Sequence, residues 1–326
     1  MRFSFLTLKI IAIVILVAIF WIDLFFISSL VSERQGYQKA FLQEITQNNI
    51  SPQTIISPYV RVPYQEAGTC LDEQKVAYAC TQEKSMYISA DSTQWQSSFD
   101  VTDHKYKRTI YRAISYQANL TAKGIFQKPA LENKNYQWNK AEIIFPVHDP
   151  RGLDTQPALT IFNKNYVFEL STQGNDDAGF DFMSISAQKY PELIPAIQNG
   201  FNFQLTANIT GLSKFTLIPT SRSVNYQAKG NWADTKYSGQ NLPFEKISSH
   251  QQFTAGWKNI ALGHQNINRL IDCDNSQCIR QFSNGYIAKN TEYETENNQK
   301  IGLSTEFLDS VNVYTQTDRA IKYGIV

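Results

Sequence analysis

The chain has 326 residues, of which 42% are hydrophobic, 13% aromatic and 18% charged, and its formal net charge is +1. This length allows one or two domains, and 17 tyrosines with 20 phenylalanines are too many for a disordered chain. The near-zero charge argues against a protein held on nucleic acid by electrostatics, so no nucleic-acid partner is expected. Four cysteines are too few for a disulfide-dense miniprotein.

The first segment with a distinct character is apolar. Residues 10–27 read IIAIVILVAIFWIDLFFI, with Asp23 as the single charge. Eighteen residues form a helix of roughly 27 Å, close to the thickness of a bilayer core. Arg2 and Lys9 precede it, which favours an amino terminus in the cytoplasm. We therefore expect a cytoplasmic segment at 1–9 and a transmembrane anchor at 10–30.

A cleaved signal peptide and a buried core helix are the alternatives for this segment. The residues after Phe26 read ISSLVSER and contain no A-x-A-like cleavage site, and the length of the apolar run argues against a core helix. An uncleaved anchor places the chain beyond Leu30 outside the cytoplasm.

The periodicity changes twice after the anchor. Tyr37, Phe41 and Ile45 recur at four-residue spacing, which predicts a juxtamembrane helix over 31–50 that ends at Ser51-Pro52. From 51 to 315 the chain consists of short alternating runs separated by Gly, Pro, Asn and Asp, which is typical of strands. These runs predict a large, mainly β, antiparallel domain with a sandwich-like arrangement.

A weak internal repeat bears on the number of β units. Residues 118–121 read ANLT and residues 207–210 read ANIT, and each is followed five residues later by a phenylalanine. The repeat leaves two versions open, one β unit or two tandem β units.

The cysteines form two local pairs, Cys70 with Cys80 and Cys273 with Cys278. Outside the cytoplasm such pairs favour disulfides, and the short spacing favours pairing within each pair. Free thiols or a metal site are the alternatives, although zinc sites prefer closer pairs. No metal or other cofactor is expected.

The sequence His148-Asp149-Pro150-Arg151 is the best catalytic candidate by residue type. Asp-Pro-x-Gly is also a turn sequence, in which Asp149 accepts backbone hydrogen bonds, Arg151 pairs with it and Gly152 takes a positive φ. We interpret these residues as a structural turn, with a functional role as the alternative, and assign no catalytic residue.

Other chemistry-bearing residues have a structural interpretation as well. We interpret the acidic residues Asp176, Asp177 and Asp181 as part of a solvated loop and the basic run 105–112 as a solvated strand. We expect the tryptophans to belong to the β core. The alternatives are calcium binding for the acidic residues, contact with anionic lipid headgroups for the basic run, and a sugar-binding platform for the tryptophans. His104, His250 and His264 lack metal-ligand spacing.

An ordered set of motifs resembles the CreD family of bacterial inner-membrane proteins, which is associated with cell-envelope integrity. The set consists of VSERQGY at 31–37, ISPYVRVP at 56–63, DPRGL at 149–153, FTAGW at 253–257, and the tail from Val311 to Tyr323. Ser57 stands where the family often has glycine, and the cysteines are not a general family feature.

The resemblance implies a membrane protein that works by non-enzymatic interaction with envelope proteins, glycan or lipid in addition to its own bilayer. It places the amino terminus in the cytoplasm, a single span in the inner membrane, and the bulk of the chain in the periplasm. Family members continue into several transmembrane helices, so residues 316–326 are expected to begin a second, truncated membrane segment, with the carboxyl-terminal bundle absent from this chain. A glycan- or lipid-binding sensor and, further off, an envelope-polymer hydrolase are the alternative functions.

Overall fold

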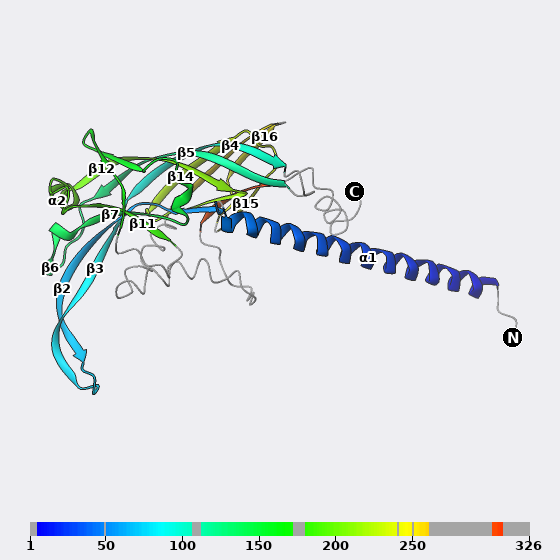
Figure 1. The fold of residues 1–326 in the computed structure, drawn as a ribbon, viewed down its shortest axis with the longest axis horizontal. Helices are drawn as coiled ribbons and strands as arrows, with labels where there is room; N and C mark the ends of the chain where they lie inside the picture. The colour runs from blue at the N-terminus through cyan, green and yellow to red at the C-terminus, as the bar shows by residue number, and fades with distance from the viewer. Residues whose placement is uncertain are drawn as a thin grey trace. The chain divides into compact units, whose positions relative to one another are not determined.

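The computed structural model describes residues 5–48, 50–105, 112–171, 180–239, 241–249, 251–260 and 302–308 (Figure 1). The chain divides into a helical unit, which includes residues 1–49, and a β unit, which includes residues 50–104 and 114–308. Cys273, Cys278, the parts of the expected β domain at 261–301 and 309–315, and the membrane segment expected at 316–326 lie outside the described residues.

The helical unit contains one long helix, α1, which runs without interruption over Phe5–Asn48. Forty-four residues span about 66 Å. Its stretch Lys9–Glu33 is long and apolar enough to cross a membrane, and side chains such as Leu16, Trp21 and Phe25 are exposed along it. Because exposed apolar surface of this extent is unfavourable in water, the helix is suited to lipid. The orientation of the span and the limits of the predicted segments stay predictions.

The β unit is built from two sheets (Figure 1). The first has ten strands. Seven follow the order β10-β11-β7-β1-β13-β18-β15, and β2 pairs with β7 and carries β3 and β6 as its other partners. Its members are β1 (Gln53–Ile56), β2 (Tyr59–Leu71), β3 (Ala77–Ser89), β6 (Asn135–Tyr136), β7 (Glu142–Val147), β10 (Glu169–Leu170), β11 (Asp181–Ser186), β13 (Lys214–Ile218), β15 (Thr235–Gly239) and β18 (Leu303–Phe307).

The second sheet has eight strands in the order β16-β17-β14-β4-β5-β12-β8-β9. Its members are β4 (Ser92–Lys105), β5 (Arg112–Gln127), β8 (Ala158–Ile161), β9 (Lys164–Val167), β12 (Gly200–Leu212), β14 (Ser223–Gly230), β16 (Glu245–Ser249) and β17 (Gln252–Ile260). The short helix α2 covers Leu193–Asn199, and a 3₁₀ turn covers Trp138–Lys140.

The expectation of an antiparallel domain needs correction at two places. β1 pairs with β13 in parallel, and β14 pairs with β4 in parallel, whereas pairs such as β1–β7, β5–β12, β14–β17 and β2–β3 are antiparallel. In both cases the two strands lie far apart in the chain. Local alternation of side chains indicates a strand but carries no information about the direction of a distant partner.

The two sheets bury one common core. In β12 the side chains alternate between buried and exposed, so one face of this strand contributes to the core and the other faces solvent. Phe99 of β4 contacts Phe215 of β13 and Phe307 of β18, with ring centroids 5.3 Å apart in both pairs. Since β4 belongs to one sheet and the other two strands to the second sheet, these rings join the sheets.

The repeated segments ANLT and ANIT lie on adjacent strands. β5 and β12 pair antiparallel with Asn119 opposite Asn208. The strands from both halves of the chain interleave within one compact unit and one core. The version with two tandem β units is therefore not the arrangement found.

The β2–β3 hairpin extends beyond the rest of its sheet (Figure 1). β7 pairs with β2 as far as Arg61, and β6 pairs with it at Tyr64 and Gln65. The pairing of β2 with β3 then continues alone to the pair Leu71 and Ala77. We call residues 66–82 the arm.

Candidate functional site

The turn after β7 is organised around the carboxylate of Asp149. This side chain is 6% exposed, and it accepts hydrogen bonds from the Ser51 amide (3.1 Å) and hydroxyl (2.7 Å). It also accepts from the backbone N (3.1 Å), Nε (2.8 Å) and Nη2 (2.8 Å) of Arg151. The 3₁₀ turn Pro150–Gly152 follows directly. Asp149 thus ties the start of the β unit at Ser51 to a turn almost one hundred residues later.

The titration of this turn follows from its contacts. Burial favours the neutral form of the Asp149 carboxyl, but the hydrogen bonds from Arg151 and Ser51 outweigh burial and hold its pKa well below the ordinary value. Burial lowers the pKa of His148, against the opposing charges of Asp149 and Asp181. At neutral pH the pair is therefore a carboxylate beside a neutral imidazole.

A serine, a histidine and an aspartate meet here, but not in the order of a catalytic triad. The Ser51 hydroxyl donates directly to Asp149 and lies 3.4 Å from Nδ1 of His148. In a triad the imidazole would stand between the hydroxyl and the carboxylate. Ser51 is also buried, so its oxygen is closed to a substrate.

Gly152 has a different reason for being glycine than the sequence suggested. Its φ is not in the positive region, so the expected left-handed conformation is wrong. A Cβ at this position would lie 2.4 Å from Nε2 of Gln53 and 2.4 Å from the carbonyl oxygen of Thr210. Since the Thr210 carbonyl is backbone, it cannot give way as a flexible side chain would. Gly152 is required by close packing of the turn against β1 and β12.

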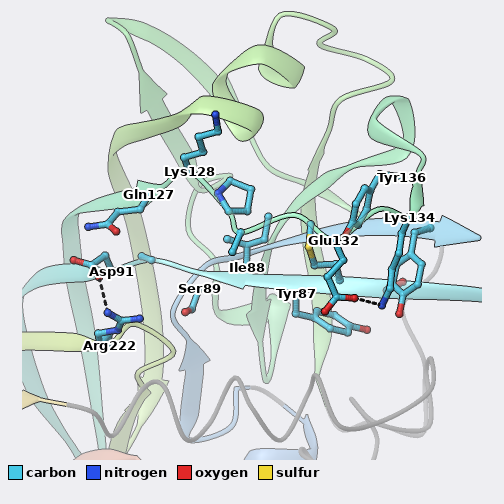
Figure 2. A pocket seen from close by; sticks show the side chains of 16 residues that line it. Tyr87, Ile88, Ser89, Asp91, Gln127, Lys128, Glu132, Lys134, Tyr136 and Arg222 are labelled. Carbon is cyan, nitrogen blue, oxygen red and sulfur yellow. Dashed lines mark ion pairs between the residues drawn. The ribbon is translucent and has the colours of Figure 1, made fainter.

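A polar groove lies at the base of the arm, with a cavity volume of about 540 Å³. It is lined by side chains of β2, β3 and β6, the end of β5, the segment 128–134, and Arg222 (Figure 2). Three distant parts of the chain thus meet at one surface. The sequence offered no signal for it, because its members share neither a motif nor a spacing.

The charges of the groove are arranged as separate pairs. Glu132 lies 2.9 Å from Lys134 at one end, and Asp91 lies 3.8 Å from Arg222 at the other (Figure 2). The hydrogen bond from Lys134 lowers the pKa of Glu132. The two carboxylates do not converge, so the geometry is not that of a general acid–base pair.

An aromatic platform stands beside the Glu132–Lys134 pair. The rings of Tyr64 and Tyr136 have centroids 5.7 Å apart, and the ammonium of Lys134 lies 4.7 Å from the centre of the Tyr64 ring. An open groove with aromatic rings, amides and charge pairs is suited to binding a polar molecule.

The remaining predicted residues are placed as follows. Cys70 and Cys80 form a disulfide with Cα atoms 5.7 Å apart. The tryptophans at 95 and 257 are buried, and those at 138 and 232 pack against the core. Asp181 lies on β11. Residues 106–111, Asp176, Asp177, His250 and His264 lie outside the described residues. Within the described ranges, no group of three His, Cys, Asp or Glu side chains could hold a metal ion.

These features define a class: a mainly β protein with one apolar amino-terminal helix able to span a membrane, a buried structural turn and a polar groove. The family model described as Inner membrane protein CreD matches residues 5–326. The chain belongs to the CreD family. Among curated proteins, it is 22% identical over 314 residues to Inner membrane protein CreD of Escherichia coli (strain K12).

That match covers 94% of this chain and 62% of the relative, so the chain spans less than two thirds of the relative's length. Among solved structures, an M1 zinc metallopeptidase from Deinococcus radiodurans matches with a TM-score of 0.26 and 6% identity, covering 52% of this chain and 38% of that one. A mutant of that enzyme bound to a Tyr-Ser-Ala substrate matches with a TM-score of 0.26 and 5% identity, and the match covers 52% of this chain and 39% of that one. Similarity at this level carries no argument.

Proposed function

We propose that this protein maintains the cell envelope through binding rather than catalysis, with α1 in the inner membrane and the β unit outside the cytoplasm. The proposal rests mainly on the Asp149 turn. The residues best suited by type to acid–base chemistry are instead committed to one another and to Ser51. A carboxylate with five hydrogen bonds and almost no exposed surface stabilises a fold and is closed to a substrate.

Two observations support the location outside the cytoplasm. Arg2 and Lys9 precede the apolar stretch, and positive charge tends to stay on the cytoplasmic side. The arm carries a disulfide, and disulfides persist in oxidising compartments.

A pair of fusions tests this topology. Alkaline phosphatase fused after Ser51 should be active, and a fluorescent reporter that matures only in the cytoplasm should be silent at the same point. The reverse pattern would place the β unit in the cytoplasm. A mature amino terminus near Ser32 would show that α1 is cleaved.

Four variants test the structural role of the turn. Asp149→Ala and Gly152→Val should lower the amount of protein in the membrane, whereas Arg151→Lys and His148→Ala should keep both the protein level and complementation of an envelope-sensitivity phenotype. The matched pair is Asp149→Ala against Arg151→Lys, because both change the same ion pair. A stable but inactive Arg151→Lys would favour a functional site.

The groove supports a second candidate, a glycan- or lipid-binding sensor. Tyr64 and Tyr136 provide a platform of the kind that sugars stack on, and Gln127, near Asp91 at the other end of the groove, contributes an amide (Figure 2). Binding of the full chain in detergent to neutral and acidic oligosaccharides would test it. Tyr136→Ala should abolish binding, and Phe162→Ala, on the distant β8–β9 turn, should not. Absence of binding to every sugar would leave the sensor without support.

A further inference from the structure

The arm is a hairpin with little support from the rest of the sheet. After Gln65, no other described strand pairs with β2 or β3. The six residues from Glu66 to Leu71 extend it by about 20 Å. An isolated two-stranded hairpin is marginally stable in water, so something must hold this one in shape.

Local contacts hold the arm rigid. The Cys70–Cys80 disulfide links its strands near the end. Gly68 leaves room for the side chain of Gln82, whose Nε2 donates to the carbonyl of Thr69 at 3.1 Å. At the turn, the carboxylate of Asp72 accepts from the Val76 amide at 2.7 Å. The arm therefore presents its end in a defined conformation without a core beneath it.

Exposed apolar side chains flank the charged turn at the end of the arm. Leu71, Val76 and Tyr78 are 65%, 60% and 53% exposed. The register places Leu71 opposite Ala77 and Thr69 opposite Ala79, so one face of the arm is a strip of small, uncharged side chains that ends at Leu71. We call Leu71, Val76 and Tyr78 the tip.

We propose that the tip inserts into the interfacial layer of the bilayer in which α1 is anchored. This proposal rests on the membrane span of α1 and does not depend on the groove or on the side of the membrane. Apolar side chains beside a tyrosine, with its apolar ring and polar hydroxyl, match the composition of that layer. The tether also keeps the bilayer at a high local concentration.

The tether and the composition of the tip favour the bilayer as the occupant, because the β unit follows α1 directly in the chain. Asp72, Glu73 and Lys75 give the turn a net charge of −1. The turn is thus suited to zwitterionic headgroups and gains nothing from anionic ones.

Site-specific photocrosslinking tests the contact. The full chain is reconstituted in vesicles of phosphatidylcholine and phosphatidylethanolamine with a tracer phosphatidylcholine, and p-benzoylphenylalanine replaces Tyr78. The matched control carries it at Phe162, which is 73% exposed on the β8–β9 turn. We expect lipid adducts at position 78 that exceed those at 162 by roughly tenfold, the factor that corresponds to burial of about one apolar side chain.

Additional variants and lipids distinguish the bilayer from other binding partners of the tip. Leu71→Asp with Val76→Asp should remove most of the lipid adduct, and phosphatidylglycerol should not increase it. A crosslink to a second copy, a crosslink to another protein in native membranes in place of lipid, or equal adducts at 78 and 162 would overturn the proposal. So would the absence of any adduct from a protein whose Cys70–Cys80 disulfide is intact by peptide mapping.

Discussion

Around Phe99, the rings of Tyr116, Phe215, Phe253 and Phe307 lie with centroids 5.3–6.2 Å from its own, and all five side chains are buried. The arm has strands of the same regular pairing, yet most of its side chains are exposed. Burial between two sheets orders the first region, and a disulfide with a few hydrogen bonds orders the second. The comparison teaches that equal backbone regularity can have unequal causes, and each cause predicts a different response to mutation.

The largest effect is expected in the core. Phe99→Ala removes a ring that joins both sheets and should lower the free energy of unfolding by about 3–5 kcal/mol. Tyr78→Ala removes a ring of similar size from the arm and should change it by less than about 0.5 kcal/mol. Denaturant unfolding of the full chain in detergent, followed by tryptophan fluorescence, measures both. Equal losses would mean that the arm is coupled to the core.

A smaller loss is expected at the Asp149 turn. Asp149→Ala leaves the buried amide and hydroxyl of Ser51 without their acceptor and should cost about 2–3 kcal/mol. Arg151→Lys should cost less, since the Arg151 side chain is 54% exposed. The same unfolding experiment compares them. A larger loss for the arginine variant would shift the structural role from the carboxylate to its partner.

Acid should weaken the turn selectively. The pKa of Asp149 is lowered by folding, so its contribution is fully present above the unfolded value of about 4 and declines as pH falls towards the lower folded value. Between pH 4 and pH 2 the protein should lose on the order of 1–2 kcal/mol from this group. Asp149→Asn should lack that part of the pH dependence. If the free energy of unfolding of both proteins depended on pH in the same way, Asp149 would not be the group responsible.

A small global effect is expected from loss of the disulfide. Cys70→Ser with Cys80→Ser should change the free energy of unfolding by less than about 1 kcal/mol, because the arm can open while the core stays folded. The same opening should accelerate amide hydrogen exchange in residues 66–82 by up to about a hundredfold, which corresponds to closing a loop of this size. A loss of about 2–3 kcal/mol in global stability would instead show that the arm and the core unfold together.

The apolar helix, the β-rich character and the Asp149 turn could be predicted because each has a local signature. β4 has only a weak strand signature in the sequence, because Thr93 and Ser97 alternate with Trp95 and Phe99 on its buried face. The hydrogen bonds of Ser51 and the groove could not be predicted, since both depend on distant segments. The packing that requires glycine at position 152 could not be predicted either, because a Cβ there would clash with residues of β1 and β12, which are distant in the sequence.

The parallel pairing of β1 with β13 has a consequence for how the β unit forms. The first strand of the unit meets its partner only after residues 214–218 are available, and β18 at 303–307 must then pair with both β13 and β15. Such non-local pairing makes folding slow. If the β unit crosses the membrane from its first strand onward, the early strands wait unpaired on the far side until the last ones arrive. During that interval their apolar edges are open to aggregation, so assembly of this protein should depend on factors that shield unpaired strands more than on the speed of membrane insertion.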